Sequence, residues 1–238
     1  RRYPSPNGKP FREAAARHHN LSPDWILPFN GGDELLSVAI RATAAEKDAV
    51  AYLEPSYSLY PVLTELQGAR AIKLQYVIDG AQWRLPAGIE DTPAAILLIV
   101  NPNAPSGHLE PVERLAQIAA AFRGLLVIDE AYVDFAPASA LELVRTHPNV
   151  LILRTMSKGY GLAGLRFGYG IAQPAVQRQL EKVRDSYPVD AVAIAAATAA
   201  LEDQTYARST WEKVKSGRTR LSAALQQIGF SLPESQSN

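Results

Sequence analysis

Short runs of branched apolar residues recur along the first two thirds of the chain. They span residues 49–54, 69–74, 94–100, 124–130 and 149–154. Continuous apolar runs of this length, without a polar residue at every second position, are typical of strands buried on both faces. Strands of that kind occur in mostly parallel sheets, so the pattern predicts one such sheet.

Segments with helical periodicity lie between these runs, at residues 33–44, 58–68 and 111–122. The second ends at Gly68 and the third begins with Pro111, which are favourable residues for a helix end and a helix start. Strands that alternate with helices predict an α/β fold, with a doubly wound sheet covered by helices on both sides. One further strand is expected at residues 166–172.

The chain after residue 172 shows helical patterns with little strand signal, and ends in a long charged helix from about residue 205 to 228 and a polar tail. We therefore expect three parts. Residues 1–24 form an N-terminal arm and residues 25–188 form the large domain. Residues 189–238 supply interdomain helices and the start of a truncated small domain.

The composition narrows the class of ligand. Lys plus Arg and Asp plus Glu each number 24, so the chain has no net charge and lacks the basic character of nucleic-acid-binding proteins. It contains no cysteine, and its four histidines show no metal-ligand spacing, so we expect no metal site. No apolar run approaches the roughly 18 residues of a membrane span, and the polar start shows no signal-peptide pattern. We expect a cytoplasmic protein that binds a small molecule.

Polar segments follow predicted strands, and open α/β sheets bind ligands beyond the carboxyl ends of their strands. The segments are NGGDE (30–34), NPNAPSG (101–107), DEAY (129–132) and SKGYGLAGLR (157–166). Their order and spacing resemble the fold-type I pyridoxal-phosphate enzymes, most closely the histidinol-phosphate aminotransferase family. The resemblance runs nearly end to end, from the RYP motif that contains Tyr3, through PSYSLY (55–60), to ESQSN at the C-terminus.

Lys158, Asp129 and Tyr132 are the candidate catalytic residues. A lysine at the sheet's carboxyl edge can bond covalently to an aldehyde when its pKa is lowered, although most loop lysines are surface residues. The resemblance implies that Lys158 carries pyridoxal 5′-phosphate and moves a proton between substrate and cofactor. It implies that Asp129 pairs with the protonated pyridine nitrogen, and that Tyr132 donates to the phenolic oxygen. The alternatives are a helix cap or structural ion pair for Asp129, and packing for Tyr132.

The cofactor's phosphate needs hydrogen-bond donors and positive charge. Gly32 and Asp33 stand at the start of a predicted helix, where backbone N–H groups bind anions. The resemblance adds Ser157 as a hydroxyl contact and Arg166 as a guanidinium contact, which suits two parallel hydrogen bonds. The alternatives are an ordinary helix cap at Asp33 and a surface salt bridge at Arg166.

Two tyrosines complete the expected cofactor site. The resemblance implies that Tyr57 stacks on the cofactor ring, where the alternative is core packing. It also implies that Tyr3 reaches the phosphate of the neighbouring subunit's cofactor. We therefore expect a homodimer with a shared active site, although a tyrosine before a proline by itself indicates only an extended segment.

The sequence departs from the family pattern in several places. Family members commonly read N-P-N-N-P-T-G, and the second asparagine of the N-N pair contacts the cofactor's phenolic oxygen. Ala104 stands at that position here, so the contact is lost or supplied by Asn103. Phe29 replaces a usual glycine. The family's carboxylate-binding arginines of the C-terminal domain fall outside the chain, so the sequence supports the cofactor better than the substrate.

The resemblance implies an aminotransferase of histidine biosynthesis, which moves an amino group from a donor such as histidinol phosphate to 2-oxoglutarate. One alternative is a decarboxylase of a phosphorylated amino acid, similar to threonine-phosphate decarboxylases, which would release carbon dioxide without an oxoacid. Another is a non-catalytic cofactor-binding or regulatory domain, which Ala104 and the missing ends would favour.

Overall fold

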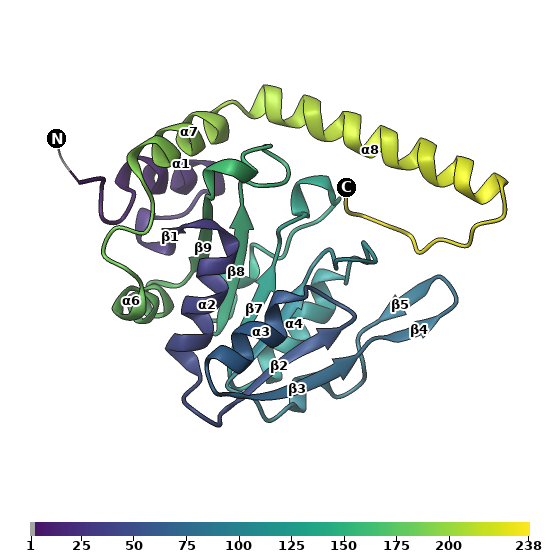
Figure 1. The fold of residues 1–238 in the computed structure, drawn as a ribbon, viewed down its shortest axis with the longest axis horizontal. Helices are drawn as coiled ribbons and strands as arrows, with labels where there is room; N and C mark the ends of the chain where they lie inside the picture. Colours follow the sequence, from purple (N-terminus) through teal and green to yellow (C-terminus); the bar gives the residue numbers. More distant parts are fainter. Residues whose placement is uncertain (1–2) are drawn as a thin grey trace.

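The central sheet of the computed structural model, which describes residues 3–238, has seven strands in the order β1-β9-β8-β7-β6-β2-β3 (Figure 1). The pairs β3–β2, β2–β6, β6–β7 and β7–β8 are parallel, whereas β9 runs antiparallel to β8 and β1. The strands are β1 (Ile26–Phe29), β2 (Ala49–Glu54), β3 (Arg70–Gln75), β6 (Ile96–Val100), β7 (Leu125–Asp129), β8 (Val150–Thr155) and β9 (Gly168–Ala172). The predicted α/β fold with a mostly parallel sheet is confirmed.

All six strands expected from the apolar runs are present. The sequence pattern missed β1, a four-residue strand interrupted by Pro28, and the separate hairpin of β4 (Val77–Asp79) and β5 (Gln82–Arg84). It missed the hairpin because β4 is exposed along its whole length and has no apolar run to mark it.

Helices cover both faces of the sheet. The α-helices are α1 (Lys9–His19), α2 (Gly31–Thr43), α3 (Leu59–Leu66), α4 (Val112–Ala121), α5 (Leu143–Thr146), α6 (Pro174–Val183), α7 (Ala191–Glu202) and α8 (Gln204–Gln227), and the 3₁₀ turns are η1 (Pro23–Trp25), η2 (Ile89–Asp91), η3 (Val133–Phe135) and η4 (Ala163–Leu165). Along β6, Leu97 and Ile99 pack with α1, α4, α5 and α7, while Ile96, Leu98 and Val100 pack with α2, α3 and α6. Alternate side chains of one buried strand therefore build two cores.

The N-terminal arm is more ordered than the sequence pattern suggested. Residues 1 and 2 lie outside the described residues, but residues 9–19 form α1, and its Phe11 is completely buried against Phe167 and Tyr169. The first part of the chain thus contributes to the core, and α1 packs alongside α7 (Figure 1).

At the other end, α8 is a long polar helix that runs along one side of the molecule (Figure 1). Asp203 begins it by accepting a hydrogen bond from the Tyr206 N–H. The chain then returns toward the sheet without helix or strand, and the Gln236 N–H donates to the Gly107 carbonyl at 2.8 Å. Within residues 3–238 no helix is both long and apolar enough to span a membrane.

The topology brings the polar segments together. The parallel strands β2, β6, β7 and β8 end at one edge of the sheet, where Val100, Asp129 and Thr155 are the last strand residues. The start of α2 reaches the same edge because β9 approaches it closely: a Cβ atom on Gly168 would lie 2.7 Å from the Gly31 carbonyl carbon and the Gly32 nitrogen. This close approach, which only glycine allows, places a helix N-terminus beside the strand ends.

Candidate functional site

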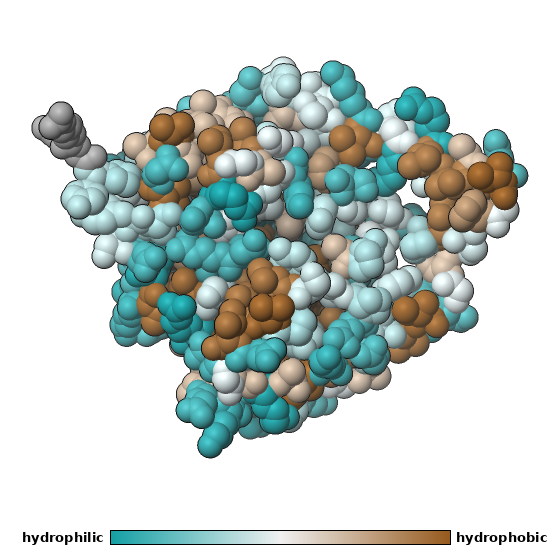
Figure 2. Space-filling model, in the orientation of Figure 1, coloured by the Kyte–Doolittle hydropathy of each residue, from teal (hydrophilic) through white to brown (hydrophobic). Residues whose placement is uncertain are grey.

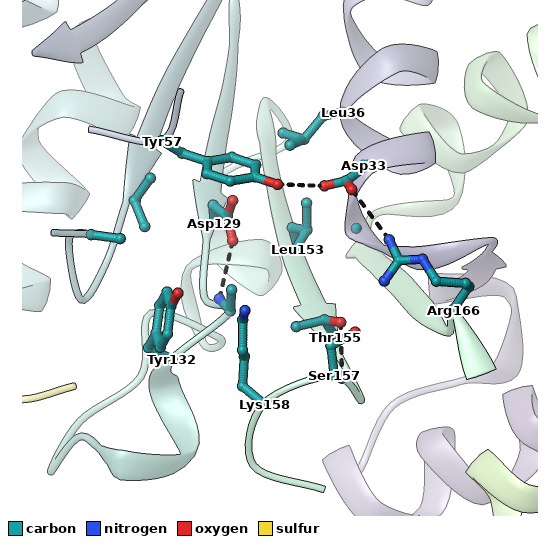
Figure 3. Close-up of a pocket in the computed structure, with 14 residues that line it drawn as sticks. Asp33, Leu36, Tyr57, Asp129, Tyr132, Leu153, Thr155, Ser157, Lys158 and Arg166 are labelled. Carbon is teal, nitrogen blue, oxygen red and sulfur yellow. Dashed lines mark hydrogen bonds and ion pairs between the residues drawn. The ribbon is translucent and has the colours of Figure 1, made fainter. Parts of the chain in front are cut away.

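A pocket opens at the carboxyl ends of β6, β7 and β8, beside the N-terminus of α2 (Figure 3). Its lining includes all but two of the predicted site residues, namely Gly32, Asp33, Tyr57, Asp129, Tyr132, Ser157, Lys158 and Arg166. The remaining lining residues are Leu36, Val100, Ala104, Ala131, Leu153 and Thr155. The pocket thus combines apolar side chains with acidic, basic and hydroxyl groups from segments far apart in the sequence.

Asp129 is a buried carboxylate at the end of β7. Its Oδ2 accepts a hydrogen bond from the Tyr60 hydroxyl at 3.1 Å, and its Oδ1 accepts one from the Ala131 N–H at 3.0 Å. Burial raises the pKa of Asp129 to about 6 despite these two bonds, because desolvation of the charged form outweighs them. A buried carboxylate of this kind is stabilised by a cation placed in the pocket.

Lys158 lies on the loop that follows β8, and its side chain extends toward the pocket (Figure 3). Its ammonium nitrogen Nζ lies 5.5 Å from the centre of the Tyr132 ring, which is within cation–π range. At the base of the same loop, the Ser157 N–H donates to Thr155 Oγ1 at 3.1 Å. The amine, a phenol and a hydroxyl therefore line one side of the pocket.

On the opposite side of the pocket, polar groups gather around the Asp33 carboxylate. Asp33, in the first turn of α2, accepts hydrogen bonds from Tyr57 Oη at 3.0 Å and from Arg166 Nη2 at 3.2 Å (Figure 3). Gly31 has a positive φ of 82°, and a Cβ atom there would lie 2.6 Å from Arg166 Nη2. Glycine thus lets the guanidinium lie against the helix start, where backbone N–H groups and the helix dipole favour negative charge.

Tyr57 is partly exposed and packs edge-on against Tyr60, with ring centres 5.7 Å apart. Burial, together with the hydrogen bond to Asp33, raises the pKa of Tyr57 to about 12. Its hydroxyl therefore stays protonated at neutral pH and acts as a donor.

Asn103, which the sequence nominated to replace the asparagine missing at position 104, does not line the pocket. Its side chain is completely buried, and its amide donates to Ser106 Oγ at 2.9 Å and to the Pro55 carbonyl at 3.3 Å. The Ser56 hydroxyl donates to its Oδ1 at 3.0 Å. The amide is occupied in holding its own loop and Ala104 faces the pocket instead, so a contact from Asn103 to the cofactor stays a prediction.

Tyr3 is also absent from the pocket of its own chain. It is 80% exposed, and its ring stacks on Tyr187 with the ring centres 4.7 Å apart. The role expected for it concerns a second subunit, so its place in the site stays a prediction.

Sequence reasoning missed two polar neighbours of the pocket. Tyr60 holds the Asp129 carboxylate, and Thr155 lines the pocket at the end of β8. Tyr60 stands three residues after Tyr57 in PSYSLY, in the first turn of the expected helix. The available signal was its place at the start of the helix that follows β2, because that helix begins at the same edge of the sheet as the pocket.

Comparisons with known proteins show the family of the chain. The family described as aminotransferase class I and II matches residues 1–238. Histidinol-phosphate aminotransferase 1 of Nostoc sp. is 46% identical over 239 residues, which cover 100% of this chain and 67% of the relative. The histidinol-phosphate aminotransferase of Geotalea uraniireducens is 44% identical, with 100% and 68% covered. The chain thus spans about two thirds of the length of these relatives.

Solved structures agree with the fold. The crystal structure of histidinol-phosphate aminotransferase from Sinorhizobium meliloti, in complex with pyridoxal-5′-phosphate, is 30% identical with a TM-score of 0.92, over 100% of this chain and 66% of that one. N-Succinyldiaminopimelate aminotransferase from Mycobacterium tuberculosis has a TM-score of 0.88 at 23% identity, over 100% and 68%. At that identity the second likeness concerns the fold alone.

Proposed function

The chain belongs to the class I and II aminotransferase family, and we propose that its pocket binds pyridoxal 5′-phosphate and transfers an amino group from a donor such as histidinol phosphate to 2-oxoglutarate. The expected family and the expected class of enzyme, a pyridoxal-phosphate-dependent transaminase, are confirmed by this membership. The observation that carries the proposal for this chain is the meeting of Lys158, Asp129 and Arg166 around one pocket.

The pocket's anion corner fits a phosphate group. In the structure the Asp33 carboxylate stands as an anion between Tyr57 and Arg166, beside the start of α2. A phosphate bound there would take donors from Arg166, Ser157 and the Gly32 N–H, and would compete with Asp33 for the guanidinium. The ion pair that it would displace is about half exposed and therefore weak.

The floor of the pocket fits a protonated ring nitrogen. Asp129 is buried with a raised pKa of about 6, which reflects an ionised form that lacks a cationic partner. A cation beside it would lower this pKa again, and the carboxylate would equally favour the protonated form of the nitrogen. The charges of the floor and of the anion corner therefore match the two ends of the cofactor.

The remaining residues have roles that follow from their chemistry. When bound, the cofactor's pyridinium ring withdraws electrons from the substrate's α-carbon. Lys158 would hold the cofactor covalently through Nζ. Once the substrate's amine had replaced it, the free amine would take the proton from the substrate's α-carbon and deliver it to C4′ of the cofactor. Tyr132 donates its phenol hydrogen to the cofactor's phenolic oxygen. With Ala104 at the neighbouring position, the chain offers a methyl group where an amide donor is usual.

Borohydride trapping tests the cofactor role directly. Incubation with pyridoxal 5′-phosphate and reduction should add the cofactor's mass to Lys158 in the wild-type chain and leave Lys158→Ala unmodified at that site. Lys215→Ala, which removes an α8 lysine paired with Glu212, is the matched control. Labelling of other lysines with Lys158 unmodified at saturating cofactor would refute the assignment.

The amino donor is tested by half-reaction spectroscopy with a panel of amino acids and phosphorylated amino alcohols. Conversion of the bound cofactor to its amine form by histidinol phosphate, and its return by 2-oxoglutarate, is the expected result. Release of carbon dioxide from a phosphorylated amino acid without an oxoacid would indicate the decarboxylase instead. Cofactor binding without any half-reaction would indicate a non-catalytic domain.

We further propose that two copies of the chain form a homodimer with a shared active site. Apolar side chains are exposed on α3, where Leu66 is 78% exposed, and on α7, where Val192 is 69% exposed. Figure 2, in the orientation of Figure 1, shows hydrophobic surface over α3 and over α7 on the same face of the molecule. A helix that is apolar on all sides, such as α7, is normally covered on all sides, which supports a partner on this face.

Sedimentation equilibrium is the test of this assembly. A dimer in the wild-type chain and a monomer in Val192→Glu is the expected outcome, whereas a wild-type monomer at tens of micromolar would refute the proposal. Cytoplasmic location also stays a prediction, which cell fractionation would check.

A further inference from the structure

The loop that carries Lys158 is held by α8. The indole Nε1 of Trp211, on α8, donates a hydrogen bond to the Gly159 carbonyl at 2.7 Å. The same indole packs edge-on against Tyr160, with the ring centres 5.4 Å apart and the planes at 88°. Gln204, at the start of α8, donates to the Tyr160 hydroxyl at 3.0 Å. Two α8 side chains thus bind the two residues that follow Lys158.

The other side of Gly159 is closed by Asp134 of η3. A Cβ atom on Gly159 would lie 2.1 Å from Asp134 Oδ2 and 2.6 Å from its Cβ and Cγ, so the glycine backbone packs directly on this side chain. The turn η3 begins immediately after Tyr132, the residue whose ring faces the Lys158 amine. Gly159 therefore lies between α8 and the segment that carries Tyr132.

The hydrogen bond from Trp211 matters because of what it restrains. Gly159 is buried, so without the indole N–H its carbonyl would lose its partner away from water. Glycine has the widest range of backbone angles, so nothing in the residue itself fixes its conformation. The carbonyl belongs to the residue directly after Lys158, and a rotation there would change the direction in which the lysine leaves the loop.

We propose that Trp211 is a positioning residue that keeps the Lys158 amine aimed into the pocket, by binding the Gly159 carbonyl from α8. The inference rests on the proposed function for the role of Lys158, but the restraint itself is a property of the cofactor-free chain. It assigns α8 a part in the chemistry, although no α8 residue lines the pocket around Lys158.

Trp211→Phe tests the restraint, because phenylalanine retains an aromatic ring beside Tyr160 and removes the N–H donor. Tyr206→Phe is the matched control, since Tyr206 lies on the same helix and is 71% exposed. In the cofactor-free chain we expect amide hydrogen exchange of residues 157–162 to accelerate about tenfold in Trp211→Phe and to stay unchanged in the control. Exchange in β7 should remain at the wild-type rate. Acceleration everywhere would indicate general destabilisation and would refute a local restraint, as would no acceleration at all.

The second measurement is the rate at which pyridoxal 5′-phosphate becomes attached to Lys158, followed by borohydride trapping and mass spectrometry. A fall of about tenfold in Trp211→Phe is the expected result, because a misdirected amine loses its alignment with the aldehyde. Gln204→Ala, which frees Tyr160 instead, should slow attachment in the same direction but by less. An unchanged attachment rate in both variants would overturn the proposal.

The two measurements separate this inference from the proposed function. If the wild-type chain takes up no cofactor at Lys158, the proposed function fails. The exchange experiment would still decide whether Trp211 restrains the loop.

Discussion

Asp129 should destabilise the cofactor-free chain at neutral pH, and its replacement by asparagine should relieve that cost. A pKa of about 6 in the folded chain, against an ordinary value of 3.8 for an aspartate, corresponds to about 3 kcal/mol of lost stability when the group is ionised in both states. Asparagine avoids the buried charge but has one oxygen in place of two. It therefore loses the bond from either Tyr60 or Ala131, at about 1 kcal/mol. The net expectation for Asp129→Asn is a gain of roughly 1–2 kcal/mol at pH 8.

The pH dependence gives this prediction its sign. Because the folded-state pKa of Asp129 is raised, the carboxyl group does not lower the free energy of unfolding below about pH 4, where it is protonated in the folded chain. The wild-type chain loses stability as the pH rises through about 6 and the buried group ionises. The difference between Asp129→Asn and wild type should therefore be small or reversed near pH 4 and largest above pH 7. Urea unfolding of both chains across this range measures it, with Asp79→Asn, at an exposed position of β4, as the control. A variant that is less stable than wild type at pH 8 would refute the reasoning.

Further predictions concern the other groups around the pocket. Gly159→Ala should lower the free energy of unfolding by about 1–3 kcal/mol, because its Cβ would overlap the Asp134 side chain; urea unfolding measures this, and an unchanged midpoint would contradict the packing. Asp33→Asn should raise the affinity of the cofactor-free chain for inorganic phosphate roughly two- to fivefold by releasing Arg166 from an exposed ion pair. Calorimetric titration would detect it, and weaker phosphate binding would argue that Asp33 supports the site rather than competing with the ligand. Arg166→Lys should weaken cofactor binding about tenfold, because lysine cannot form two parallel hydrogen bonds; an equal dissociation constant in an absorbance titration would exclude that contact.

The sequence alone determined the sheet and most of the site. Buried parallel strands need apolar side chains on both faces, so runs such as residues 94–100 and 124–130 mark them without any tertiary information. Once those strands are parallel, their carboxyl ends share one edge, and polar residues placed just after them must gather there. For this reason Asp129 and Lys158 could be assigned to one pocket from their positions in the chain.

Only the tertiary structure decided how individual polar groups are used. Asn103 and Ala104 are neighbours in the sequence, and the conformation of their loop determines that the amide is buried and the methyl group faces the pocket. Asp33 pairs with Arg166, which lies 133 positions further along the chain. The hydrogen bond from Trp211 to Gly159 spans 52 positions. A local sequence pattern indicates whether a side chain is buried or exposed. Contacts between distant residues depend instead on how separate helices and strands pack, and the packing of the whole core sets those positions.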